Sequence, residues 1–195
     1  MQIYSIIFTC RFAAYIAKQV AVKYPGKDYT VGIISPYKAE ADSIANMVEC
    51  MPNVNDHCKI TCGTVHSFQG DECDIIIFVM NPPAYIGSGS HINNQNIINI
   101  AMSRASDYLF ILSPMVESKN LVGRDTICTI AEKLDCSISN ASDIEAAMSD
   151  GNRNFIEENT IITGHNPVNV YSDEEEMRLY EVRISDTAID IKINK

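Results

Sequence analysis

The sequence predicts an α/β fold built on a parallel sheet, and three observations lead to this prediction. Short apolar runs alternate along the chain with segments whose apolar residues recur at helical spacing. Two of these runs, 74–80 and 108–113, are almost wholly apolar, as expected of strands that are buried on both faces of a sheet. Polar loops separate the elements. Strands that alternate with helices favour parallel pairing, with the helices packed on the sheet.

The expected elements of the first 115 residues follow one another in turn. A helix is expected over 5–21, where apolar residues recur at helical spacing before a Lys-Tyr-Pro-Gly segment. A second helix over 38–51 is ended by Pro52. A third helix over 93–103 follows a loop rich in Asn, Pro, Gly and Ser. The expected strands of this part of the chain cover residues 30–35, 60–65, 74–80 and 108–113.

The pattern changes after Pro114. Short helices are expected over 125–135 and 143–148, with turns rich in Ser and Asn between them. Alternation of apolar and polar residues, which is typical of half-exposed antiparallel strands, occurs over residues 160–163, 168–171, 178–184 and 188–193. The sequence therefore predicts an α/β domain over 1–115 and a small C-terminal α+β appendage over 116–195.

The composition limits what the chain can bind by itself. Its 195 residues, of which 46% are hydrophobic, suffice for one domain of ordinary size with an appendage. The net charge is −10, but residues 1–115 carry nine acidic residues against seven basic ones, so most of the acidity lies after them. Proteins that bind nucleic acid are usually basic. We therefore expect weak binding of nucleic acid by the chain alone.

The cysteines and the apolar segments indicate a cytoplasmic protein. Seven cysteines without a C-x-x-C pair are typical of reduced thiols rather than of a disulfide framework. His57, Cys58 and Cys62 are of ligand type, but a second half-site is missing, so we expect no metal site in this chain. No stretch reaches about eighteen apolar residues, so no membrane span is expected.

The segment 63–74, GTVHSFQGDECD, is the strongest functional signal. It stands between two apolar runs, and α/β sheets bind ligands in polar loops at the carboxyl ends of their strands. Gly70 permits a close backbone approach or a positive φ. The acids at 71–74 precede an apolar strand instead of following one. They therefore do not match the carboxylates that hold magnesium at the end of a strand in ATPases.

Two further segments complete the pattern. These are VGIISPYKAEA at 31–41 and NIAMSRA at 99–105, the second followed by the apolar run YLFIL. In this order, the three segments resemble motifs IV, V and VI of superfamily 1 helicases, in the branch typified by the nonsense-mediated-decay and Dna2-type enzymes. The resemblance covers residues 1–115. It implies a RecA-like, three-layer fold of the P-loop NTPase type, and the second of the two RecA-like domains between which such a motor binds ATP.

The resemblance assigns four residues to the nucleotide. Arg104 of NIAMSRA corresponds to the Arg that reaches the γ-phosphate across the cleft, where a planar guanidinium neutralises the charge of the transition state. Gln69, Gly70 and Glu72 match the F-Q-G-x-E segment, in which the Glu accepts hydrogen bonds from the ribose. The alternatives are that Arg104 interacts only with the dipole of a helix end and that Glu72 is a solvated acid before a strand.

The resemblance also implies a groove for single-stranded DNA or RNA. Motif V contributes Thr64 and His66 to it, and motif IV contributes Ser35, Pro36 and Tyr37. A hydroxyl such as that of Thr64 binds a phosphate without reading sequence, or Thr64 is an ordinary β-branched strand residue. His66 contacts the backbone or makes a structural hydrogen bond. Tyr37 is a packed anchor or a platform for base stacking.

Three positions depart from the family pattern. Asp71 and Ser106 stand where the family commonly has basic residues, and Glu40 replaces the usual Gln of motif IV, so we expect Glu40 to point away from phosphates. These departures and the acidic balance favour a stand-alone, non-catalytic module that binds nucleic acid or protein. The combination of Arg104 with Glu72 favours the motor domain instead.

The sequence contains no G-x-x-x-x-G-K-[ST] phosphate loop. We therefore expect the C-terminal motor domain of an ATP-dependent helicase that does not hydrolyse ATP by itself. ATP and Mg²⁺ would be shared with a first RecA-like domain of the same parent protein, which supplies the magnesium ligands.

Overall fold

The computed structural model describes residues 2–51, 56–68, 70–80, 95–114, 136–140, 144, 148 and 177–183. The helices are α1 (Gln2–Lys23), α2 (Lys38–Glu49) and α3 (Gln95–Met102). The strands are β1 (Tyr29–Ser35), β2 (Cys58–Thr64), β3 (Cys73–Val79), β4 (Ala105–Pro114), β5 (Cys136–Asn140) and β6 (Met177–Arg183).

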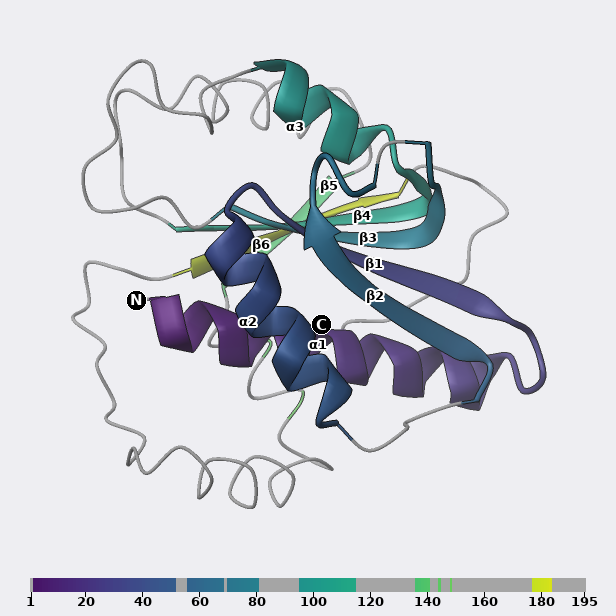
Figure 1. Ribbon diagram of the computed structural model, residues 1–195. Helices are drawn as coiled ribbons and strands as arrows, with labels where there is room; N and C mark the ends of the chain where they lie inside the picture. The colour runs from purple at the N-terminus through teal and green to yellow at the C-terminus, as the bar shows by residue number, and fades with distance from the viewer. Residues whose placement is uncertain are drawn as a thin grey trace.

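The strands form one sheet with helices on both faces (Figure 1). The strand order is β2-β1-β3-β4-β6-β5. The first four strands in this order pair in parallel, and β6 is antiparallel to both β4 and β5. Figure 1 shows α1 and α2 on one face of the sheet and α3 on the other. The predicted α/β fold with a parallel sheet is confirmed.

The elements end close to where the sequence places breakers. Helix α1 ends at Lys23, and the chain then turns at Gly26, whose φ is +82°. Helix α2 ends at Glu49, three residues before Pro52. All seven elements predicted between residues 5 and 113 are present, with ends shifted by a few residues.

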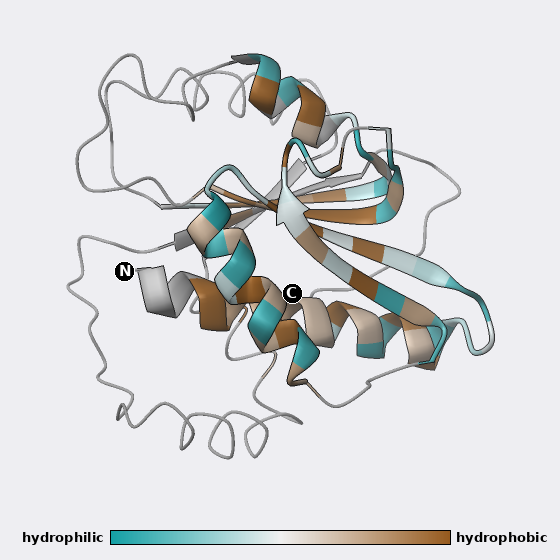
Figure 2. Ribbon diagram, viewed as in Figure 1, coloured by the Kyte–Doolittle hydropathy of each residue, from teal (hydrophilic) through white to brown (hydrophobic). Residues whose placement is uncertain are grey.

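The sheet separates two apolar clusters, because successive strand residues point to opposite faces. Ile33 and its register partner Ile77 belong to the cluster under α1 and α2. Ile34 and its partner Phe78 belong to the cluster under α3. All four side chains are fully buried. Figure 2 accordingly shows hydrophobic strands in the middle of the sheet and mixed hydropathy along α2.

Two described strands lie beyond Pro114. Strand β6 confirms the antiparallel strand predicted over 178–184. Strand β5 lies where the sequence indicated turns, and that expectation was wrong, because pairing with β6 outweighs the turn preference of Ser and Asn. The remaining predicted elements lie outside the described residues, apart from residues 144 and 148: helices over 125–135 and 143–148, and strands over 160–163, 168–171 and 188–193.

Candidate functional site

The segment 63–74 does not stay at one edge of the sheet. Thr64 ends β2 at the carboxyl edge, whereas Cys73 begins β3 at the amino edge. Seven strand residues at about 3.3 Å each separate these edges by roughly 20 Å. Val65 and Phe68, which lie between them, are buried in the cluster under α3. The expectation that the whole loop lies at the carboxyl ends of strands was wrong for its second half, because a connection between parallel strands must return to the amino edge.

Phe68 fixes the middle of this returning segment against β1. The contact depends on Gly32, because a Cβ built on Gly32 would lie 2.6 Å from Ile76 Cδ1, 2.8 Å from Phe68 Cε1 and 3.0 Å from Cys73 Sγ. Phe68 is only 6% exposed. A glycine in an apolar strand therefore provides the space through which the segment crosses the sheet.

At the carboxyl edge, the residues assigned to nucleic acid lie on neighbouring strands. Ser35 and Thr64 are register partners at the ends of β1 and β2. The Thr64 carbonyl accepts hydrogen bonds from the Ser67 backbone N–H at 3.0 Å and from Ser67 Oγ at 2.7 Å. This bonding closes a turn that places His66 on the surface. The structure thus brings Thr64 and His66 beside the turn that follows β1.

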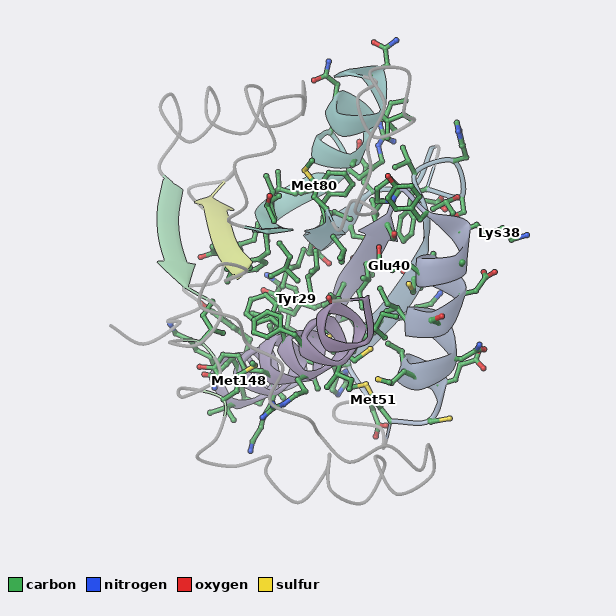
Figure 3. The ribbon with its side chains drawn as sticks, turned by 90° about the vertical axis from the view of Figure 1, so that its left-hand side faces the viewer. Tyr29, Lys38, Glu40, Met51, Met80 and Met148 are labelled. Atoms are coloured by element: carbon green, nitrogen blue, oxygen red, sulfur yellow. The ribbon has the colours of Figure 1, made fainter. Side chains whose placement is uncertain are left out.

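The turn after β1 is held by a buried hydroxyl. Ser35 is fully buried, and its Oγ donates to Glu40 Oε2 at 2.6 Å and accepts from the Tyr37 N–H at 3.1 Å. Pro36 is buried, and Tyr37 packs against the cluster under α3. In Figure 3, Lys38 points away from the sheet, whereas Glu40 lies between α2 and the sheet. Ser35 therefore shapes the turn, and the packing of Tyr37 favours its interpretation as an anchor.

At the amino edge, the residues assigned to the nucleotide also lie on neighbouring strands. Cys73 and Ala105 are register partners, and the Cys73 N–H donates to the Arg104 carbonyl at 2.9 Å. Glu72 and Arg104 each immediately precede one of these partners, and Glu72 is exposed. Gly70 has a φ of +93°, the positive φ that the sequence offered as one of two reasons for a glycine there. Gln69 lies outside the described residues.

The Arg104 side chain rests on the end of its own helix. Its Nε donates to the Ile100 carbonyl at 3.3 Å, Nη2 to Ser103 Oγ at 3.1 Å and Nη1 to the Asp71 carbonyl at 3.5 Å. All three acceptors are neutral, and two of the distances are at or beyond the upper end of the usual range. No carboxylate of the described residues pairs with this guanidinium. The side chain therefore has the geometry of a helix-end Arg that is not locked in place.

Four acidic residues, Asp71, Glu72, Asp74 and Asp107, lie in or next to the first residues of β3 and β4. Burial raises the pKa of the Asp107 carboxyl, the neighbouring Asp74 carboxylate raises it further, and Lys27 opposes both. The other acids near this edge are Asp71 and Glu72, which are both exposed. These acids repel an anion bound at this edge, whereas the Arg104 guanidinium attracts it.

Three buried or half-buried thiols near the sheet, those of Cys10, Cys58 and Cys62, are expected to be unreactive. Burial raises the pKa of Cys10 and Cys62 to about 12 and that of Cys58 to about 11, so these thiols stay protonated at neutral pH. His57 Nδ1 lies 2.8 Å from Asp28 Oδ1. The described part of the chain holds no cluster of three His, Cys, Asp or Glu side chains suited to a metal ion. Within that part, no helix is long and apolar enough to cross a bilayer.

Sequence reasoning missed two residues that support these edges. Thr30 hydrogen-bonds to Asp74 across 44 positions of the chain, and no local pattern relates residues so far apart. Gly32 did leave a signal, since a lone glycine inside an apolar strand indicates the close approach of another segment.

Two comparisons relate the chain to helicases. A family model described as an AAA domain (AAA_12) matches residues 6–115, more than half of the chain. A protein of Dictyostelium discoideum described as a probable helicase is 31% identical over 107 residues. That match covers 53% of this chain and 10% of the relative. The chain thus spans only about a tenth of the curated relative, so the activity of the whole relative does not transfer directly.

Methyltransferases are among the solved structures that resemble this chain. A Haemonchus contortus phosphoethanolamine N-methyltransferase matches with a TM-score of 0.41 and 11% identity, covering 89% of this chain and 38% of that one. A precorrin-6Y C5,15-methyltransferase domain of Corynebacterium diphtheriae matches with a TM-score of 0.42 and 10% identity, covering 89% and 96%. Likeness this loose supports no argument about activity.

Proposed function

The chain belongs to the AAA domain family AAA_12, the C-terminal RecA-like domain of superfamily 1 helicases of the nonsense-mediated-decay type, and on this premise we propose that it supplies half of an ATP site. In this proposal, Arg104 contacts the γ-phosphate and Glu72 accepts hydrogen bonds from the ribose. Gln69 and Gly70 complete the segment that lines the nucleotide.

The observation that carries this proposal is the adjacency of two motifs at the amino edge. Arg104 and Glu72 are 32 positions apart in the sequence, yet they precede register partners on adjacent strands. The hydrogen bond from Cys73 to the Arg104 carbonyl joins the two backbones directly. A nucleotide facing this edge would therefore meet both side chains.

Arg104 has the freedom that the role requires. Its guanidinium rests on neutral acceptors at 3.1 to 3.5 Å, so turning toward a phosphate sacrifices weak contacts and gains charge-assisted ones. Negative charge spreads over the transferred group in the transition state of phosphoryl transfer. A contact that strengthens as this charge develops accelerates turnover more than it tightens binding.

The other half of the site belongs to another domain in this proposal. The sequence has no phosphate loop, so a first RecA-like domain of the parent protein holds the ATP phosphates and Mg²⁺. When bound, Mg²⁺ neutralises charge on the β- and γ-phosphates. Residues 1–115 then form the motor domain, and residues 116–195 form an appendage to it.

The carboxyl edge would contribute to the groove for single-stranded DNA or RNA. Thr64 and His66 lie in one turn there, beside the Ser35-Pro36-Tyr37 turn of the neighbouring strand. The Ser35 hydroxyl is already bonded to Glu40, so we assign Ser35 and Pro36 to shaping this surface. Thr64 and His66 would make the contacts with the phosphate backbone.

The test is Arg104→Ala in the helicase that contains this domain. We expect nucleic-acid-stimulated ATP turnover to fall by about 10³ to 10⁵, the range known for an Arg that acts in this way. Arg104→Lys should restore little, because a point charge does not reproduce the planar guanidinium. Circular dichroism should show an intact fold, since the Arg104 side chain is only half-buried and bonds to neutral acceptors at 3.1 to 3.5 Å. Turnover within a few-fold of the wild type would refute the assignment.

A stand-alone, non-catalytic module is the second candidate. The exposed Asp71, whose carbonyl lies 3.5 Å from the Arg104 guanidinium, favours it, because a negative charge there opposes binding of an anion. Fluorescence anisotropy with single-stranded DNA and RNA separates the candidates. The half-site predicts weak, salt-sensitive binding by this chain and no ATP turnover. Tight, salt-resistant binding would favour the module.

A further inference from the structure

Three hydrogen bonds between Thr30 and Asp74 join β1 to β3 at the amino edge. Asp74 Oδ2 accepts from the Thr30 N–H at 2.8 Å and from the Thr30 hydroxyl at 2.7 Å. The Asp74 N–H donates to Thr30 Oγ1 at 3.0 Å. The hydroxyl thus acts as donor and acceptor at once, and the carboxylate makes two short charge-assisted bonds. This arrangement is a local clamp between two strands.

The clamp lies where the ordinary strand pairing is irregular. Strand β3 advances two residues from Cys73 to Ile75 while its partner β4 advances three, from Ala105 to Tyr108. The extra residue in β4 is a bulge, which interrupts the regular ladder. The regular β1–β3 register begins only at Val31 and Ile75. The first residues of β3 therefore depend on bonds other than those of the ladder.

These first residues adjoin the proposed half of the ATP site. Asp74 follows Glu72 by two positions, and the intervening Cys73 N–H bonds to the Arg104 carbonyl at 2.9 Å. The Arg104 guanidinium also reaches the Asp71 carbonyl at 3.5 Å. A shift of the segment that precedes β3 would therefore change the distance between Glu72 and Arg104.

We propose that Thr30 and Asp74 are positioning residues of this half-site, whose clamp holds the backbone of Glu72 at a fixed place relative to Arg104. The inference rests on the proposed function. Neither residue touches the nucleotide in this proposal. Their effect on turnover is geometric, because a misplacement of about 1 Å at a reacting centre costs about 10²-fold in rate.

The test compares two substitutions of Thr30 in the helicase that contains this domain. Thr30→Val keeps the branched shape but removes the hydroxyl, whereas Thr30→Ser keeps the hydroxyl. We expect Thr30→Val to lower kcat for ATP at least tenfold with a smaller change in KM. Thr30→Ser should restore turnover to within about threefold of the wild type. Hydrogen exchange at residues 71–74 should rise in Thr30→Val and remain low in Thr30→Ser.

Ile77→Val is the matched control for loss of stability. Ile77 is fully buried in the same strand, away from the bulge, so its truncation should weaken the fold without moving the amino edge. Assayed well below its melting temperature, Ile77→Val should turn over ATP as the wild type does. If Thr30→Val lost no more turnover than Ile77→Val, the clamp would only stabilise the fold, and the inference would be overturned.

Arg104→Ala, assayed in parallel, separates this inference from the proposed function. Loss of turnover in Arg104→Ala together with normal turnover in Thr30→Val would overturn the positioning role alone. Normal turnover in Arg104→Ala would overturn the half-site and, with it, the positioning role. Loss in both variants, with rescue by Thr30→Ser, is the expected result.

Discussion

Gly32→Ala is expected to disturb the segment that joins the two edges of the sheet. Gly32 lies in β1 under Phe68, and the added Cβ would approach Ile76 Cδ1 to 2.6 Å, Phe68 Cε1 to 2.8 Å and Cys73 Sγ to 3.0 Å. Phe68 is 6% exposed and Ile76 is fully buried, so neither side chain can move out of the way freely. The added methyl group would therefore lie in a packed interior that has no room for it.

Two opposing effects determine how much stability Gly32→Ala loses. Overpacking a core by one methyl group costs typically about 1–3 kcal/mol. Replacing a glycine also restricts the unfolded chain, which stabilises the folded state by about 0.4–1 kcal/mol where the backbone tolerates it. We expect a net loss of about 1–2 kcal/mol for Gly32→Ala, because the overpacking involves three contacts at 3.0 Å or less.

The assay is a double-mutant cycle followed by urea unfolding. Phe68→Leu should cost stability by itself but should leave room beside residue 32, so Gly32→Ala should cost less in that background. Residues in contact commonly couple by about 0.5–3 kcal/mol. If Gly32→Ala were neutral, or if the two changes were additive, Phe68 would not rest on Gly32 as the structure indicates, and the reasoning would fail.

Three further predictions concern ionisable and buried groups. In Ellman's assay at pH 8, the exposed Cys50 should react quickly. Cys10 should react only when the protein unfolds, because burial raises its pKa to about 12. Equal reaction rates of the two thiols would contradict this expectation. Burial raises the pKa of Asp107, so the folded state loses stability as pH rises from the ordinary pKa near 4 to the raised one, and the loss is complete above it. Asp107→Asn should therefore raise Tm at pH 7 and lose this gain below about pH 4, which a melting series across pH will check. Ser35→Ala should cost about 1–3 kcal/mol in urea unfolding because it removes a hydrogen bond from the buried Glu40 carboxyl, and a loss below about 0.5 kcal/mol would argue against that role.

The centre of the parallel sheet was predictable because β1, β3 and β4 are largely buried on both faces. Beyond Asp74, strand β3 is buried on both faces, so residues 75–79 form a continuous apolar run that identifies the strand directly. The sequence of strand β5, in contrast, does not predict a strand. Its Ser and Asn residues match turn preferences, and only its pairing with β6, about forty residues further along, makes it a strand. Local patterns do not contain that pairing.

The sequence predicts which residues form the candidate site, and that membership stays a prediction, but it did not predict how the residues are arranged. Thr64 and Glu72 are eight positions apart, and a compact polar loop would have kept them together. The buried Phe68 instead draws the segment across the face of the sheet, so the two residues lie at opposite edges. Arg104 and Glu72 are far apart in sequence, and they precede register partners on adjacent strands only because of strand pairing, which depends on the register of the sheet.

The three departures from the family pattern differ in physical consequence. Glu40 is 5% exposed and receives the Ser35 hydroxyl at 2.6 Å, so its charge is withdrawn from the carboxyl-edge surface, as expected. Ser106 is exposed and uncharged, so it only omits a basic group. Asp71 is exposed at the amino edge, and its carbonyl lies 3.5 Å from the Arg104 guanidinium. Of the three, Asp71 alone adds negative charge where the nucleotide would bind. It is therefore the departure that would most directly weaken binding of the nucleotide to the proposed half-site.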